Sequence, residues 1–361
     1  MADRGENEFP VFACSEALSG ESGSTGLLLQ QNMWEVVPLL GYGIVEQQGT
    51  QNPEEDETTC RTLTTEDLIS EELLLPQSEE TQQTALIPES VEATAGTALG
   101  NFRPAVQQVQ IDRTQLADYE TLVRNFYAID ANTMAGSDQL SVEKLLGMDM
   151  TLPQEGDGPQ ILIYHTHSQE AFVDSVPGDV NTGIVGVGEC LTKILTEQYG
   201  YRVLHHTGQY DVETRDNAYS RALPAVEQIL AENPSIQVII DLHRDEVAEE
   251  TKLVTDIQGR PTARFMFFNG LSRTRKTGDI DYLANENQEA NLAFSFQMQL
   301  KAAEYYPGLT RRIYLKGYRY NMHLRPRTLL VELGAQNNTV EEAINACDPL
   351  AHILDMVLKG E

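Results

Sequence analysis

The sequence predicts an α/β fold in which a mostly parallel sheet carries helices on both faces. Three short apolar runs, at 160–164, 236–242 and 328–333, have the length and composition of strands buried on both sides. Segments with apolar residues at helical spacing alternate with such runs, and this alternation is typical of βαβ units. Because ligands of such sheets bind at the carboxyl ends of strands, we expect the functional residues there.

The individual elements follow from local signals. The turn residues at 156–159 precede the first strong strand, and Gly200 closes the helix that follows it. Pro234 separates the next helix from its strand, while the apolar spacing around 119–127 fits either a helix or a strand. The predicted elements are strand 160–164, helix 185–195, strand 201–205, helix 217–232, strand 236–242, strand 263–268, helix 285–303, strand 312–315, strand 328–333 and helix 340–359.

The first third of the chain differs in composition from the rest. Residues 1–115 hold about 20 acidic residues, four arginines and no lysine. Segment 48–95 lacks sustained apolar periodicity, which favours a flexible acidic linker. We therefore expect a largely flexible N-terminal region at 1–115. One folded domain is expected at 116–361, with a lead-in at 116–156 and a core at 157–361.

Net charge and cysteine spacing exclude several classes of protein. The formal net charge is −30, so phosphate backbones and anionic membrane surfaces would be repelled, and we exclude nucleic acid as a partner. The cysteines show no paired spacing typical of a structural zinc site, and two of them lie in apolar helical patterns that predict core positions. No run of about 18 apolar residues occurs, so the chain as given is either soluble or the outer part of an anchored protein. The cysteines are Cys14, Cys60 and the two predicted core residues, Cys190 and Cys347.

Three strand-like runs end in residues that bind metal ions or move protons. The first leads into His167 and Glu170, whose spacing places an imidazole and a carboxylate on one face of a turn. His243 ends the second run and Glu332 ends the third. Parallel strands bring their carboxyl ends to one edge of a sheet. We therefore expect His167, Glu170 and His243 to bind one ion, as in open catalytic zinc sites.

Glu332 and Arg244 complete the predicted chemistry. A zinc ion with three protein ligands and one water lowers the pKa of that water from about 15.7 to about 7. Glu332 is then the candidate base, which draws a proton from the water and passes it to a leaving nitrogen. Arg244 is the candidate for stabilising an oxyanion or binding a substrate carboxylate.

The other histidines have less specific assignments. His165, two residues before His167, is open to three roles: a fourth contact to the ion, a support for a metal ligand, or a side chain that caps the strand. We favour the support. His205, His206 and His352 belong to no such motif, and ordinary surface or core positions are expected for them.

In combination, these motifs resemble one protein family. The runs from Ile161 to Phe172, from Val238 to Asp245 and from Leu329 to Ala343 are similar to the stage II sporulation protein P family of endospore-forming bacteria. The resemblance extends from about Asp118 to the C-terminus and leaves the acidic region uncovered. One departure is the run 321–324, where the family leads us to expect an Asn-Gln-Asp-Leu-like sequence. In this run, Asn321 and His323 are candidates for supporting the site or contacting the substrate.

The resemblance implies a zinc-dependent N-acetylmuramoyl-L-alanine amidase. It implies the fold of cell-wall amidases and, more remotely, of zinc carboxypeptidases. The implied reaction cleaves peptidoglycan between N-acetylmuramic acid and L-alanine during engulfment of the forespore, with endopeptidase action on cross-linked stem peptides. The domain at 116–361 is then the catalytic domain, in which His167, Glu170 and His243 bind Zn²⁺ and Glu332 is the general base.

The resemblance also implies a location and partners. Family members usually carry a membrane-spanning segment near the N-terminus. An extracytoplasmic protein is therefore expected, membrane-anchored in its native form between mother cell and forespore, with the anchor absent from this chain. The implied partners are peptidoglycan, a sporulation lytic transglycosylase and the membrane anchor protein of the engulfment machinery.

Two other functions stay open at this point. A zinc carboxypeptidase of the same fold would need a pocket for a free carboxylate, for which Arg244 or Arg319 is available. A non-catalytic wall-binding module would hold zinc only for stability, or would hold none. Structural zinc sites usually close all four positions, most often with cysteine, and no cysteine lies near these motifs in the sequence.

Overall fold

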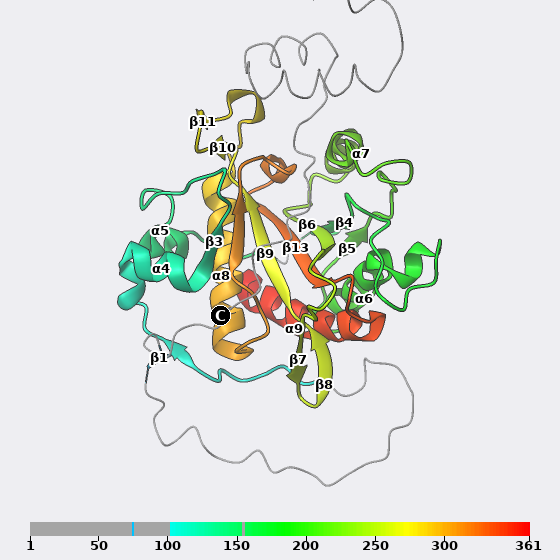
Figure 1. Cartoon of the computed structure of the whole chain (residues 1–361), viewed down its shortest axis with the longest axis horizontal. Helices are drawn as coiled ribbons and strands as arrows, with labels where there is room; N and C mark the ends of the chain where they lie inside the picture. Colours follow the sequence, from blue (N-terminus) through cyan, green and yellow to red (C-terminus); the bar gives the residue numbers. More distant parts are fainter. Residues whose placement is uncertain (1–73, 76–101, 154–155) are drawn as a thin grey trace, which may run out of the picture. The chain divides into compact units, whose positions relative to one another are not determined.

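The computed structural model describes residues 74–75, 102–153 and 156–361 (Figure 1). Most of the predicted acidic region lies outside these residues, as do Cys14 and Cys60. The described segment from Phe102 onward packs on the domain, and Ile111 is buried in the main core. The predicted boundary between residues 115 and 116, and the flexibility of the region before it, stay predictions.

A seven-stranded sheet forms the centre of the described domain, in the order β3-β12-β9-β13-β6-β4-β5 (Figure 1). Five of its six strand pairings are parallel, and the pairing of β9 with β13 is antiparallel. The prediction of a mostly parallel sheet is therefore confirmed. The strands are β3 (Tyr127–Ile129), β4 (Ile161–Tyr164), β5 (Val203–His205), β6 (Val238–Asp245), β9 (Phe265–Gly270), β12 (Ile313–Lys316) and β13 (Arg327–Ala335).

The direction of β9 follows from its connection to β6. After β6 the chain forms the hairpin of β7 (Val254–Ile257) and β8 (Arg260–Ala263), and no helix intervenes before β9. A parallel strand would need a crossover connection, usually a helix, to return the chain to the other edge of the sheet. Without one, β9 starts at the edge where β6 ends and runs against β13.

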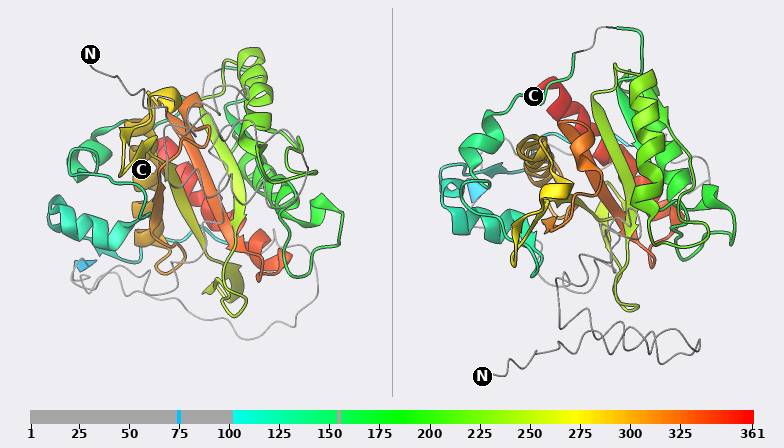
Figure 2. Two further views of the ribbon diagram at one scale, coloured as in Figure 1. Left: turned by 45° about the horizontal axis from the view of Figure 1, so that its top comes forward. Right: turned by 90° about the horizontal axis from the view of Figure 1, so that it is seen from above.

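Helices cover both faces of the sheet, as predicted (Figures 1 and 2). The longer helices are α6 (Ile184–Glu197), α7 (Ala218–Glu232), α8 (Gln288–Tyr305) and α9 (Val340–Lys359). Residues of α6, α8 and α9 share the main core with Ile163 and Leu242 of the sheet. On the other face, Val226 of α7 packs with Leu162 and Ile239. Among the described residues, no helix combines the length and apolar composition needed to cross a membrane.

Side chains at helix starts explain where two helices begin. The Asp118 side chain accepts a hydrogen bond from Thr121 N, which starts α4 (Tyr119–Phe126). The ambiguous segment around 119–127 thus forms α4 and then β3. Thr339 and Glu342 form a capping box at the start of α9. The remaining elements are β1 (Leu74–Leu75), β2 (Gln110–Ile111), α5 (Val142–Gly147), β10 (Arg273–Thr274), β11 (Gly278–Asp279) and the 3-10 turns η4 (Gln115–Ala117), η5 (Val180–Thr182), η6 (Asp281–Leu283) and η7 (Met322–Leu324).

Strand alternation directs the predicted functional side chains to the α7 face. Ile239 of β6 packs with α7, so Asp241 and His243, at steps of two residues, point to the same face. Leu330 of β13 also packs with an α7 side chain, which places Glu332 on this face. The parallel register pairs Glu332 with His243. The sheet therefore brings the predicted base next to a predicted metal ligand.

Candidate metal centre

The three predicted metal ligands lie together near the carboxyl ends of β4 and β6. His167 and Glu170 come from the loop after β4, and His243 comes from β6. Each offers one ligand atom, and these atoms lie within 4.8 Å of one another. His167 Nδ1 is 3.6 Å from Glu170 Oε1, and His243 Nδ1 is 3.5 Å from Glu170 Oε2. All three side chains are buried.

Two aspartates hold the loop after β4 in place. Asp241 of β6 accepts hydrogen bonds from Thr166 N at 2.9 Å and from Thr166 Oγ1 at 2.7 Å. Asp211, in the loop before α7, accepts hydrogen bonds from Ser168 Oγ at 2.8 Å and from Gln169 N at 3.2 Å. The two ligands on this loop are therefore positioned by segments that are distant in the sequence.

The surroundings of His167 suit a metal ligand. Both of its ring nitrogens are buried and have no hydrogen-bond partner in the described part of the chain. A buried polar atom without a partner costs free energy, and a bound ion would remove that cost at one nitrogen. Burial lowers the pKa of His167 to about 3, so the ring is neutral, which is the form that binds metals. Two imidazoles and one carboxylate fit the protein ligands of a catalytic Zn²⁺ site.

Asp241 orients the ring of His243. Asp241 Oδ1 lies 2.8 Å from His243 Nε2, so Nδ1 is the nitrogen that faces Glu170. A carboxylate in this position is a common support for a metal-binding imidazole. Burial disfavours the charged ring, but Asp241 and Glu170 beside it raise the pKa of His243 well above its usual value. Metal binding at Nδ1 would therefore displace a proton.

Glu332 has the properties expected of a general base. Glu332 is 8% exposed, and its Oε2 has no hydrogen-bond partner among the residues that the structure describes. Burial raises the pKa of Glu332 to about 8. A carboxylate with a pKa near neutrality can both take up and release a proton at working pH. Glu332 also pairs with His243 in the sheet, and a base that acts on a metal-bound water must lie beside the metal ligands.

Two arginines lie around Glu170. The backbone N–H of Arg244 donates to Glu170 Oε2 at 2.8 Å, while the Arg244 guanidinium donates to the carbonyls of Ala171 and Asp245 at 3.0 and 3.2 Å. The second is Arg215, whose Nη2 donates to Glu170 Oε1 at 2.9 Å. Sequence reasoning missed Arg215, because it lies 45 residues from Glu170 in a loop without a motif.

His165 belongs to a separate hydrogen-bonded chain. Its Nδ1 is 2.8 Å from Leu242 O, and its Nε2 is 3.0 Å from His205 Nε2. His205 Nδ1 is in turn 3.0 Å from Glu189 Oε2. Burial lowers the pKa of His165 to about 3, so its neutral ring donates to the Leu242 carbonyl and accepts from His205. The hydrogen bond to Leu242 O holds the residue that precedes His243 in β6. The role of His165 as a support stays a proposal.

Asn321 donates to the backbone of Tyr219, whose ring lies beside two of the three ligands. Asn321 is buried and left-handed, with φ of 54°, and its Nδ2 donates to Tyr219 O at 3.0 Å. The Tyr219 ring lies 5.6 Å from the His167 ring and 6.3 Å from the His243 ring, between centroids. His323 follows in η7, where burial lowers its pKa to about 4. The roles predicted for Asn321 and His323 stay predictions.

Comparison with known proteins identifies the family. A sequence model of the family described as Stage II sporulation protein P (SpoIIP) matches residues 47–355. The chain belongs to this family. The stage II sporulation protein P of Bacillus subtilis (strain 168) is 26% identical over 217 residues, which are 55% of this chain and 51% of the relative. The chain therefore spans about half the length of the curated family member that it matches.

Several solved structures are similar to the domain at low identity. The N-acetylmuramyl-L-alanine amidase Ami1 from Mycobacterium smegmatis is 13% identical, with a TM-score of 0.35, over 57% of this chain and 100% of that chain. The CwlD amidase from Clostridioides difficile, solved in complex with the GerS lipoprotein, is 12% identical, with a TM-score of 0.33, over 56% of this chain and 95% of that chain. Both likenesses are too remote to assign residues or substrates to this member of the SpoIIP family.

Proposed function

We propose that this chain is a zinc-dependent peptidoglycan hydrolase that cleaves the amide bond between N-acetylmuramic acid and L-alanine of the stem peptide. The observation that carries the proposal is the meeting of His167, Glu170 and His243 beside the buried Glu332. Membership of the sporulation family supports the cell wall as the substrate. The proposal includes endopeptidase action on cross-linked stem peptides and a role in engulfment.

In the proposed reaction, three residues bind the metal and a fourth transfers a proton. His167, Glu170 and His243 would hold Zn²⁺, which when bound lowers the pKa of a water molecule and polarises the substrate carbonyl. Glu332 takes a proton from the attacking water as the new bond forms between the water oxygen and the carbonyl carbon. When the bond between carbon and nitrogen breaks, Glu332 gives that proton to the leaving nitrogen, and the carboxylate is regenerated. Its pKa of about 8 suits both transfers.

The setting of the reaction is part of the same proposal. A family of sporulation proteins that acts on peptidoglycan works outside the cytoplasm, and a membrane anchor would hold the domain near the wall. The proposed partners are a sporulation lytic transglycosylase and the membrane anchor protein of the engulfment machinery. Co-precipitation of this chain with a lytic transglycosylase from engulfing cells tests them, and recovery of neither partner would contradict this part.

Replacing Glu332 by glutamine tests the function. We expect wild-type protein with zinc to release free stem peptides from purified sacculi, and Glu332→Gln to bind zinc but release none, because the base is missing. The matched control is Glu304→Gln. Glu304 is also a buried glutamate whose pKa is raised by burial, but it lies on α8, on the opposite face of the sheet. Products are identified by mass spectrometry, and bound metal is measured on each protein.

The products separate the candidate functions. Free stem peptides from wild type and from Glu304→Gln, but not from Glu332→Gln, support the amidase. Cleavage between linked stem peptides supports the endopeptidase activity. Release of a terminal amino acid alone would indicate a carboxypeptidase instead. Zinc-loaded wild type that binds sacculi and cuts nothing would indicate a wall-binding module and would contradict the proposal.

A further inference from the structure

Arg215 places a half-exposed positive charge beside the ligand set of the candidate metal centre. Its Nη2 donates to Glu170 Oε1 at 2.9 Å, and its side chain is 48% exposed, whereas the Glu170 side chain is 1% exposed. The guanidinium thus reaches from solvent to a buried carboxylate of the ligand set. A guanidinium carries five N–H donors, and this is the hydrogen bond that the structure gives it within the described residues.

The loop before α7 holds Arg215 in this position from two sides. Asp211 ties the loop to Ser168 and Gln169, next to the metal ligands. Arg221, in the first turn of α7, donates to Tyr210 O at 2.5 Å and to Thr214 O at 2.6 Å. The residue is therefore part of an ordered loop that is anchored on both α7 and the metal loop.

The charges around Arg215 keep it a cation. Burial disfavours the charge, but Glu170 and, to a smaller extent, Glu332 raise the pKa of the guanidinium. Arg215 thus lies within electrostatic range of a predicted ligand and of the predicted base. The Arg244 guanidinium is already bonded to the carbonyls of Ala171 and Asp245.

We propose that Arg215 is a catalytic residue whose guanidinium donates to the carbonyl oxygen of the scissile amide as that oxygen gains negative charge. The inference rests on the proposed function. Arg215 keeps its own protons throughout, because the proton of the attacking water passes through Glu332 to the leaving nitrogen. A preorganised donor of this kind stabilises the transition state more than the ground state, so it acts on kcat rather than on KM.

The test compares Arg215→Ala with Arg215→Lys on a soluble muropeptide, with all proteins loaded with zinc. We expect Arg215→Ala to lower kcat by about 10²- to 10³-fold and to leave KM nearly unchanged. Arg215→Lys should recover part of the loss, because it keeps the charge without the planar fork of donors. Added guanidinium chloride should raise kcat of Arg215→Ala. Competition with a chelator should show that Arg215→Ala binds zinc as tightly as wild type.

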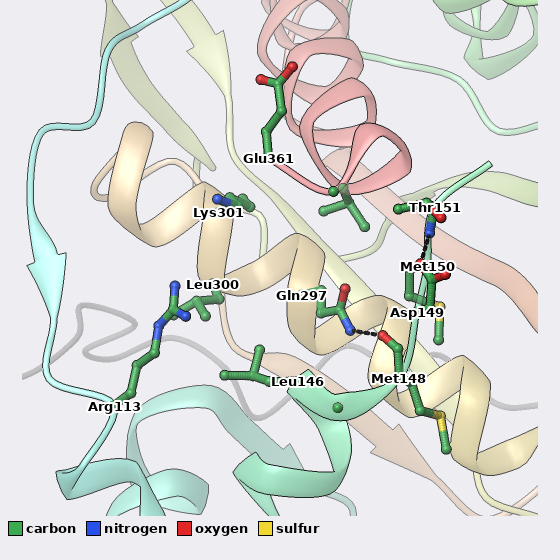
Figure 3. Close-up of a pocket in the computed structure, with 13 residues that line it drawn as sticks. Arg113, Leu146, Met148, Asp149, Met150, Thr151, Gln297, Leu300, Lys301 and Glu361 are labelled. Carbon is green, nitrogen blue, oxygen red and sulfur yellow. Dashed lines mark hydrogen bonds between the residues drawn. The ribbon is translucent and has the colours of Figure 1, made fainter. Parts of the chain in front are cut away.

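Arg113 offers a closely matched control. Like Arg215, it is a half-exposed arginine beside a buried glutamate: its side chain is 55% exposed and lies 4.0 Å from the carboxylate of Glu304. Arg113 lies at a cavity that is lined by residues of α8, the end of α9 and segment 146–151 (Figure 3). Helices α8 and α9 cover the face of the sheet opposite α7. Arg113→Ala removes the same charge and side chain, and we expect it to leave kcat unchanged and insensitive to guanidinium.

Different outcomes contradict different claims. If wild type releases stem peptides and Arg215→Ala does so at the same kcat, the inference is wrong and the proposed function stands. If Arg215→Ala loses activity together with its tight binding of zinc, Arg215 holds Glu170 and does not contact the substrate, which also overturns the inference. If zinc-loaded wild type releases no stem peptide, the proposed function fails and the inference fails with it.

Discussion

His165 and His167 show how two identical side chains acquire different properties within three residues. The ring nitrogens of His167 have no partner among the described residues, whereas both nitrogens of His165 are engaged, by Leu242 O and by His205. Burial lowers the pKa of both to about 3. The spacing of the two histidines in the sequence carries no sign of this difference, because the partners of His165 come from β5 and β6.

The buried, neutral His165 should make folding sensitive to acid. In the unfolded chain a histidine takes up a proton near pH 6.5, but in the folded protein His165 stays neutral down to about pH 3. Between these values the unfolded state binds the extra proton, so the free energy of unfolding falls as pH falls, by at most about 1.4 kcal/mol per pH unit from this residue. Denaturant unfolding of zinc-free protein between pH 6.5 and pH 5 measures the slope.

The variant His165→Asn isolates this contribution. The amide nitrogen of asparagine can donate to Leu242 O as Nδ1 does, but the side chain does not titrate. We expect the free energy of unfolding of the variant to depend less steeply on pH than that of the wild type. Equal slopes for the two proteins would show that His165 takes up its proton over the same pH range in the folded protein as in the unfolded chain, which would contradict the lowered pKa.

At the scale of elements, the packing of α6 against the sheet depends on a glycine. A Cβ built on Gly188 of α6 would lie 2.6 Å from His165 Nε2 and 2.8 Å from His205 Nε2. The histidine pair therefore occupies the space that a side chain at this position would need. The absence of a side chain at residue 188 is what allows α6 to approach β4 and β5 at this point.

Gly188→Ala should lower stability. The new methyl group must displace two buried rings, and overpacking of this kind costs about 1–3 kcal/mol. Gly147→Ala is the control: it also lies in a helix, α5, but a Cβ there meets nothing within 4 Å. In the control, alanine should raise the free energy of unfolding by up to about 1 kcal/mol through helix propensity. Unfolding curves in urea compare the two, and equal effects would contradict the proposed crowding at Gly188.

Element prediction from the sequence succeeded where the signal was local. The apolar run at 236–242 and the helical spacing at 340–359 correspond to β6 and α9. The direction of β9 depends on the β7–β8 hairpin, which was not predicted and whose short strands at 254–257 and 260–263 mix polar and apolar residues. The sequence shows no helical pattern between β6 and β9, and this was the signal from which the reversal of chain direction could have been predicted.

At the scale of the whole molecule, the candidate ligands connect separate parts of the chain. His167 and Glu170 follow β4, and His243 lies on β6, so the three come together only in the folded domain. An ion that binds this set stabilises the folded state by an amount that grows with its concentration relative to Kd. The net charge of −30 adds a general attraction for cations, which is screened by salt, whereas binding at the buried set is not.

Metal removal should therefore lower the unfolding temperature. We expect zinc at about 1,000 times its Kd to stabilise the wild type by about 4 kcal/mol, and a chelator to remove the effect. His167→Ala should melt at the same temperature with and without zinc, because one ligand is gone and no hydrogen bond of the fold is lost with it. Calorimetry at high salt measures both. A zinc effect of equal size in the variant would place the binding elsewhere.

The sequence by itself determined the fold class and the residues at the three strand ends. Apolar runs, helical spacing and the motifs around His167, His243 and Glu332 are local patterns, and they also carried the resemblance to the family that the comparison confirmed. Only the tertiary structure decided which other side chains lie beside these residues. The contacts of Arg215 with Glu170 and of His165 with Leu242 and His205 join residues 40 to 77 positions apart. Such contacts depend on strand order and loop placement, which no local pattern encodes.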